Sequence, residues 1–119
     1  MNLILGSIVI RCFEFDKMYI FWKEALGYEP RHAPLEFWVI LEDPKKTKPN
    51  ISLDQAPNKR EGKWSWLHLD LYTNNLKDEV ERLISLGAKE YPWRYPENAN
   101  YTVLEDPDGN LFCVVEKIY

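Results

Sequence analysis

Residues 103–110 read VLEDPDGN, and this stretch decides the fold because an earlier stretch, residues 39–46, reads VILEDPKK. In both copies LEDP follows a short apolar run, and the second copy lies 63 positions after the first. Proline presets φ and Gly109 accepts a positive φ, so the chemistry of the second copy is that of a tight turn. Either the likeness is a coincidence, or it marks a turn before the last strand of two duplicated halves.

Two more pairs of segments favour duplication. Leu26-Gly27 matches Leu86-Gly87 at an offset of 60, and the strand-like residues 7–12 match residues 68–73 at an offset of 61. Glycine after a helical apolar pattern is typical of a helix end. Three markers in the same order, with slowly drifting offsets, predict an internal repeat.

The periodicity gives each half the order β-α-β-β-β. In the first half we expect a strand at 3–12, a helix at 16–26, an extended stretch at 28–31 and strands at 37–42 and 51–55. A polar linker covers 56–63, and the second half is predicted as a strand at 66–72, a helix at 75–86, an extended stretch at 88–91 and strands at 101–105 and 111–116. The apolar stripes of the two helices are Met18, Phe21, Trp22, Ala25 and Leu26, and then Leu76, Val80, Leu83 and Ile84. Neither half buries both faces of its sheet alone, so the halves are expected to pack together.

Bulk properties exclude several classes of protein. The 119 residues are 45% hydrophobic and 29% charged, which suits one globular domain with a real core. A formal charge of −4 argues against a nucleic-acid partner. No apolar run reaches the ~20 residues of a membrane helix, and the N-terminus lacks the pattern of a signal peptide. Cys12 and Cys113 sit in apolar runs without zinc-site spacing, which predicts two buried free thiols in a cytoplasmic protein.

Period-two alternation predicts which side chains face the helices and which face a cleft. Leu67, Leu69 and Leu71 are expected to face the second helix, which leaves His68, Asp70 and Tyr72 on the other face. On the first strand the same reasoning assigns Ser7, Val9 and Arg11 to the cleft. Inward charges are costly unless paired, so Arg11 and Asp70 are expected to form a structural pair or to recognise a polar ligand.

Aromatic residues are expected around the cleft as well. Trp and Tyr combine apolar area with a polar tip, which suits ligand pockets, although core and dimer contacts are expected for more than half of them. The candidates are Trp38, Trp64, Trp66, Trp93, Tyr95 and Tyr101. The segment WRYPENAN, residues 93–100, is predicted to be a loop or flap that sets specificity.

The stretches LGSIVIRC, FWKEALGYEP, WLHLDLYTNNLKDEVERLISLGAK and VLEDPDGNLFCVV resemble the vicinal oxygen chelate superfamily of glyoxalases, extradiol dioxygenases and bleomycin-resistance proteins. Among them the likeness is strongest to small glyoxalase-like domain proteins. The resemblance implies an α+β fold in which two βαβββ modules pair to form a curled mixed sheet with a cleft. It implies one domain over 1–119, with module 1 at about 1–57, a linker at 58–63 and module 2 at about 64–119. It also implies a homodimer.

Enzymes of this superfamily often bind a divalent metal through His and Glu side chains on the first and last strands of each module. Position by position, the resemblance places the metal-ligand positions at Ser7, at His68, at Cys113 and near Leu53. Gln55 lies two residues beyond Leu53 on the same strand. Only His68 matches, so no metal cofactor is expected. The alternative is a divalent metal such as zinc held by His68 with Cys113.

Three functions follow from this comparison. The first is metal-free binding of a small planar or aromatic molecule, with a site made of Ser7, Arg11, Trp38, Gln55, Trp66, His68, Asp70, Tyr72, Trp93, Tyr101 and Cys113. The second is a lyase, isomerase or dioxygenase-like enzyme with an atypical site that uses His68 in catalysis. The third is a structural or interaction module whose cleft its own side chains fill. The only partners expected are a small-molecule ligand and a second copy of the chain, with no nucleic acid or membrane.

Overall fold

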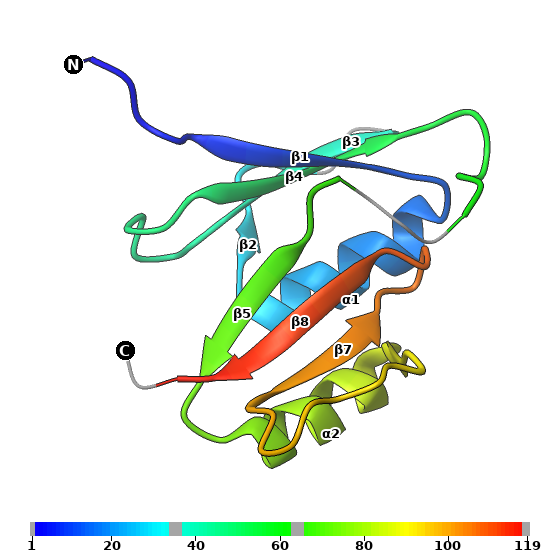
Figure 1. Ribbon diagram of the computed structural model, residues 1–119. Helices are drawn as coiled ribbons and strands as arrows, with labels where there is room; N and C mark the ends of the chain where they lie inside the picture. The colour runs from blue at the N-terminus through cyan, green and yellow to red at the C-terminus, as the bar shows by residue number, and fades with distance from the viewer. Residues whose placement is uncertain (1, 34–36, 63–65, 118–119) are drawn as a thin grey trace. The chain divides into compact units, whose positions relative to one another are not determined.

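A computed structural model describes residues 2–33, 37–62 and 66–117 of the chain (Figure 1). The chain divides into two compact units, Met1–Arg60 and Glu61–Tyr119, and the boundary falls within the segment 58–63. Trp64, one of the candidate aromatic residues, lies outside the described residues. None of the helices in the described ranges has the length and apolar character needed to span a membrane.

The first unit contains one helix and a four-stranded sheet. Its elements are β1 (Ser7–Cys12), α1 (Phe15–Leu26), β2 (Glu29–Pro30), β3 (Trp38–Glu42) and β4 (Asn50–Gln55). The strand order is β1-β4-β3-β2, with β1 parallel to β4 and the other pairs antiparallel. Because a parallel pair requires a crossover connection, α1 lies between the strands in sequence and packs on β4.

The second unit repeats this topology. Its elements are β5 (Leu69–Thr73), α2 (Leu76–Leu86), β6 (Lys89–Glu90), β7 (Tyr101–Glu105) and β8 (Leu111–Glu116). The strand order is β5-β8-β7-β6, again with one parallel pair, β5 and β8, and α2 packs on β7 and β8. Figure 1 shows β5, β8 and β7 side by side. The predicted duplication and the α+β class with two mixed four-stranded sheets are confirmed.

The apolar stripe of α1 packs into the core of the first unit. Met18, Phe21, Trp22 and Ala25 are buried, as their helical spacing predicts, and the rings of Phe21 and Trp22 meet edge to face at 5.1 Å. The helix ends at Gly27, whose φ of 67° lies in the left-handed region that favours glycine. In α2, Leu83 is buried, but Ile84 is 42% exposed, so its assignment to the stripe was wrong.

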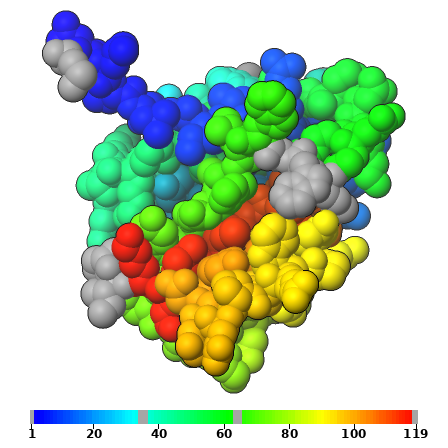
Figure 2. All heavy atoms as spheres, in the orientation of Figure 1, coloured from blue at the N-terminus to red at the C-terminus, as the bar shows by residue number. Residues whose placement is uncertain are grey.

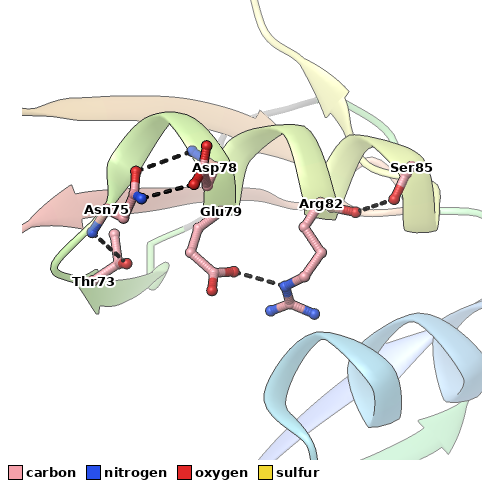
Figure 3. A network of polar contacts seen from close by, with 6 residues as sticks. All are labelled: Thr73, Asn75, Asp78, Glu79, Arg82 and Ser85. Carbon is pink, nitrogen blue, oxygen red and sulfur yellow. Dashed lines mark hydrogen bonds and ion pairs between the residues drawn. The ribbon is translucent and has the colours of Figure 1, made fainter.

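Side-chain hydrogen bonds fix the start of α2 (Figure 3). Asn75 is the N-cap: its Oδ1 accepts from the backbone N–H of Asp78 at 3.3 Å, and its Nδ2 donates to Asp78 Oδ2 at 2.8 Å. The backbone N–H of Asn75 donates to Thr73 Oγ1 at 3.0 Å, which ties the end of β5 to the helix. Asp78 and Glu79 in the first turn also complement the helix dipole.

The repeated LEDP has a structural role in each unit. Asp43 and Asp106 are both buried. Asp43 accepts hydrogen bonds from the backbone N–H groups of Lys45 and Thr47 and from Thr47 Oγ1. Asp106 accepts from the backbone N–H groups of Asp108 and Asn110 and from Asn110 Nδ2. The aspartates therefore hold the turns that precede β4 and β8, where backbone donors would otherwise lack partners.

Two predicted strands begin later than expected. The first begins at Ser7 rather than residue 3, and Leu3 and Ile4 are each 93% exposed. Figure 2 shows the blue N-terminal end of the chain projecting outward. The fifth begins at Leu69 rather than residue 66, and Leu67, predicted to face the helix, is 84% exposed. The parallel registers put residues 46–49 opposite residues 3–6 and residues 109–110 opposite residues 66–67, and these segments belong to the loops between LEDP and the partner strands rather than to the strands.

Candidate functional site

The sheet of the second unit brings chemically distinct side chains into rows on one face. The register places Asp70 of β5 opposite Cys113 of β8, and Cys113 opposite Val103 of β7. The next row on this face is Tyr72, Val115 and Tyr101. Since side chains two residues apart share a face, His68 extends the face just before β5 begins. The prediction that His68, Asp70 and Tyr72 lie on the face away from α2 agrees with their exposure.

His68, Asp70 and Cys113 form a cluster in which one ligand atom of each lies within 4.8 Å of the others. His68 Nε2 is 3.0 Å from Asp70 Oδ1, and the two side chains are 54% and 47% exposed. Partial burial raises the pKa of the Cys113 thiol, and the charge and hydrogen bond of the Asp70 carboxylate raise this pKa further. The prediction of two buried thiols is confirmed for Cys12 and is wrong for Cys113, which is only half-buried.

A pocket of about 140 Å³ adjoins this cluster. Its walls are mostly apolar, and it shares His68 and Cys113 with the cluster. The lining residues are His68, Trp93, Tyr101, Val103, Leu111, Phe112 and Cys113. An apolar pocket with few polar groups is the usual form of a small-molecule site.

Aromatic side chains of the segment 91–100 pack beside this pocket. Trp93 Nε1 donates to Tyr101 Oη at 3.3 Å, and the rings of Tyr95 and Tyr101 meet at 5.5 Å. Tyr95 Oη accepts from the backbone N–H of Val103 at 2.9 Å, while the N–H of Tyr91 donates to the carbonyl of Val103. The segment predicted to be a loop is a loop, and its own aromatic residues attach it to β7.

The equivalent positions of the first unit carry different chemistry. The strand registers match His68, Asp70 and Cys113 to Ser7, Val9 and Ser52. Ser7 Oγ and Ser52 Oγ are 2.6 Å apart and hydrogen-bonded. The expected counterpart of Cys113 near Leu53 is therefore corrected by one residue to Ser52, because Leu53 is fully buried on the opposite face. Gln55 Nε2 instead donates to the Phe13 carbonyl.

The other predicted site residues lie in separate places. Arg11 of β1 lies opposite Asp54 of β4. On the other side of β4, Trp38 of β3 also lies opposite Asp54, and the ring of Trp38 is 5.2 Å from the ring of His32. These residues belong to the first unit and Asp70 belongs to the second, so the Arg11–Asp70 pair remains a prediction. Trp66 is fully exposed and does not line the pocket, and Tyr72 carries the Lys117 ammonium 4.9 Å from its ring centroid.

Sequence reasoning did not identify Asp70 as a metal-ligand candidate or Ser52 as the counterpart of Cys113. The spacing His-x-Asp on a strand was a signal for Asp70, because it puts both side chains on one face. Val103, Leu111 and Phe112 were also missed as pocket residues, since apolar strand residues carry no local mark of a pocket wall.

The donor sets decide which positions fit a divalent metal. Ser7 and Ser52 offer two neutral hydroxyls bonded to each other, and Val9 offers nothing, so the first-unit positions do not fit. His68, Asp70 and Cys113 offer nitrogen, oxygen and sulfur, the donor types of a three-ligand metal site. The second-unit positions therefore fit a metal by donor type and proximity.

Comparisons with known proteins agree with this fold. A search of curated protein sequences gives no match. Among solved structures, a glyoxalase/bleomycin resistance protein/dioxygenase family enzyme from Burkholderia phytofirmans PsJN is similar with a TM-score of 0.77 at 16% identity, over 98% of this chain and 100% of that one. The fosfomycin resistance protein FosX from Listeria monocytogenes gives 0.75 at 16% identity, over 99% and 96%.

A mutant of the Listeria monocytogenes FosX, complexed with Mn(II) and 1S,2S-dihydroxypropylphosphonic acid, gives a TM-score of 0.74 at 12% identity, over 97% of this chain and 90% of that one. At these identities the likeness concerns the fold. The model of the glyoxalase-like domain family matches residues 7–115, which includes both units from β1 to β8. With the duplicated βαβββ topology and this match across nearly the whole sequence, the chain belongs to the glyoxalase-like domain family.

Proposed function

We propose that the chain binds a small, largely apolar molecule with an aromatic ring in the pocket of the second unit. The observation that supports this most directly is the lining of the pocket, in which Trp93 and Tyr101 stand with apolar strand residues and His68. A cavity of about 150 Å³ accommodates benzene, and the pocket volume of about 140 Å³ is of this size. We therefore expect the ligand to be a single aromatic ring with one polar substituent.

His68 is the polar contact in this proposal. Its Nε2 faces the Asp70 carboxylate, an acceptor, so Nε2 carries a proton and the ring is oriented by that contact. The other ring nitrogen, Nδ1, is then the atom available to a hydroxyl or amine of the ligand. This recognition uses no metal, in keeping with the hydroxyl pair of Ser7 and Ser52 at the first-unit positions.

Phenol is a suitable probe because it joins one ring to one hydroxyl. We expect saturable changes in the backbone amide NMR signals of Val103, Leu111 and Cys113 during a phenol titration in the presence of EDTA. His68→Ala is expected to weaken binding, whereas His32→Ala, which changes the other histidine in the first unit, leaves it unchanged. Leu111→Trp, which fills the pocket, should abolish binding. Phenol binding that is unaffected by Leu111→Trp would rule out this pocket.

A second candidate function is a metal-dependent enzyme with an atypical site. The specific observation in its favour is the cluster of His68, Asp70 and Cys113, and the Mn(II) complex of FosX is a precedent in the same fold. Metal analysis of the purified protein tests it. Stoichiometric transition metal that is lost in His68→Ala supports this candidate, and protein that takes up no metal from solution rejects it.

A further inference from the structure

Tyr101 is a second pocket residue, besides His68, whose polar atom is oriented by a neighbour. Trp93 Nε1 lies 3.3 Å from Tyr101 Oη. The indole nitrogen can only donate, so the Tyr101 oxygen accepts this hydrogen bond and its own O–H remains available as a donor. Among the described residues this O–H has no acceptor. The Tyr101 hydroxyl can therefore donate to a bound molecule.

The ring of Tyr101 is also held in place by the segment 91–100. The rings of Tyr95 and Tyr101 meet at 5.5 Å, and Tyr95 is itself fixed because its hydroxyl accepts from the backbone N–H of Val103 at 2.9 Å. Contacts thus restrain Tyr101 both at its ring and at its hydroxyl oxygen. A donor that is already held in place loses less conformational entropy on binding than a mobile one.

His68 and Tyr101 reach the pocket from opposite ends of β8. Continuing the register of β5 and β8 by one residue puts His68 opposite Leu111, whereas Tyr101 lies opposite Val115. These two positions on β8 are four residues apart, which is about 13 Å along an extended strand. Both side chains nevertheless line the same pocket, so they bound it at its two ends.

We propose that the pocket selects an aromatic ring that carries a hydrogen-bond acceptor opposite its hydroxyl, and that Tyr101 recognises this acceptor. The inference rests on the proposed function and adds to it the second substituent of the ligand. His68 Nδ1 accepts from the ligand hydroxyl, and the Tyr101 O–H donates to a nitrile, carbonyl or nitro group at the far end of the ring. Because the two contacts have opposite sense, they also fix the direction in which the ring lies.

Two phenols of nearly equal shape test this contact. The substituents of para-cyanophenol and para-ethynylphenol are both short rods, but only the nitrile nitrogen is a good acceptor. In NMR titrations with EDTA present, we expect para-cyanophenol to bind about 2- to 10-fold more tightly, the range of one net hydrogen bond. Tyr101→Phe should remove this preference. Tyr91→Phe, which removes a hydroxyl of the same segment that is not among the described pocket residues, should keep it.

Titration with phenol itself separates a failure of this inference from a failure of the proposed function. If all three phenols bind and Leu111→Trp abolishes their binding, but the preference is the same in the parent protein and in Tyr101→Phe, the inference is wrong and the proposed function stands. If none of the three binds, both are wrong. The affinity of Tyr101→Phe for para-ethynylphenol shows whether its pocket is intact. Loss of that binding would make Tyr101 a residue that shapes the pocket, and it would also overturn the inference.

Discussion

His68 Nε2 and Asp70 Oδ1 lie 3.0 Å apart, two residues from each other at the start of β5. The contact is local, because alternation on an extended chain puts the two side chains on one face. Its partner from a distant part of the sequence is Cys113, which the parallel pairing of β5 and β8 brings opposite Asp70. Asp70 therefore takes part in two contacts: a local one with His68 and a long-range one with Cys113, which the pairing of β5 with β8 produces.

Asp70→Asn tests what the carboxylate does for His68. The pair is about half exposed, so its loss should change the free energy of unfolding by less than about 1 kcal/mol. Phenol binding should nevertheless weaken, because the imidazole is no longer held by a charged acceptor. Urea denaturation and the phenol titration measure the two effects separately. A large loss of stability with unchanged phenol binding would make Asp70 a structural residue only.

Tyr95→Phe tests how the segment 91–100 is attached to β7. The Tyr95 hydroxyl accepts from the backbone N–H of Val103, a residue that is 4% exposed. A buried donor left without a partner costs about 1 to 3 kcal/mol, and we expect a loss of unfolding free energy in this range. Tyr91→Phe is the matched control, since its hydroxyl has no hydrogen-bond partner among the described residues. Equal stability of the two variants would contradict this attachment.

The repeat and the order of its elements along the chain could be predicted from sequence because their signals are local: turn chemistry, helix-ending glycine and alternation. The residues at which β1 and β5 begin could not be predicted in this way. The residues before Ser7 and before Leu69 have the composition of strands, but a strand forms only where a partner lies opposite it. Asn50 and Leu111 begin the partner strands after the turns that Asp43 and Asp106 hold, so the loop residues before them offer no strand to pair with. The limits are therefore set by residues more than 40 positions away.

The site was predictable in part for the same reason. His68 and its facing follow from alternation, and counting from the turn glycine reached Cys113. The role of Asp70 was missed because its charge was assigned to Arg11, in the other half of the sequence. The register shows a nearer relationship, Asp70 with Cys113, and it places Asp54 opposite Arg11 in the first unit.

The lowered pKa of the Asp43 carboxyl predicts that the protein loses stability at acid pH. Burial alone would raise the pKa of this carboxyl, but the hydrogen bonds from Thr47 and Lys45 and the charge of Lys48 together lower it below its usual 3.8. A lowered pKa in the folded state gives stability that is present above pH 3.8 and is lost as the pH falls further. Asp43→Asn should therefore be less stable than the parent protein at pH 7, and this difference should shrink by pH 3. Urea denaturation at both values measures it, and a difference that widens at pH 3 contradicts the sign.

Asn75→Ala should destabilise the second unit through the start of α2. The side chain accepts from the backbone N–H of Asp78, and an N-cap of this kind contributes about 1 kcal/mol. Asn74→Ala is the matched control, because this exposed neighbour precedes the cap and makes none of the hydrogen bonds drawn at the helix start (Figure 3). Thermal denaturation and amide hydrogen exchange over 76–79 measure the effect. If only the helix start frays, exchange rises there while Tyr101 and Val103 on β7 stay protected, and the pocket still binds phenol. Equal exchange in the two variants would show that the helix start does not depend on the Asn75 side chain.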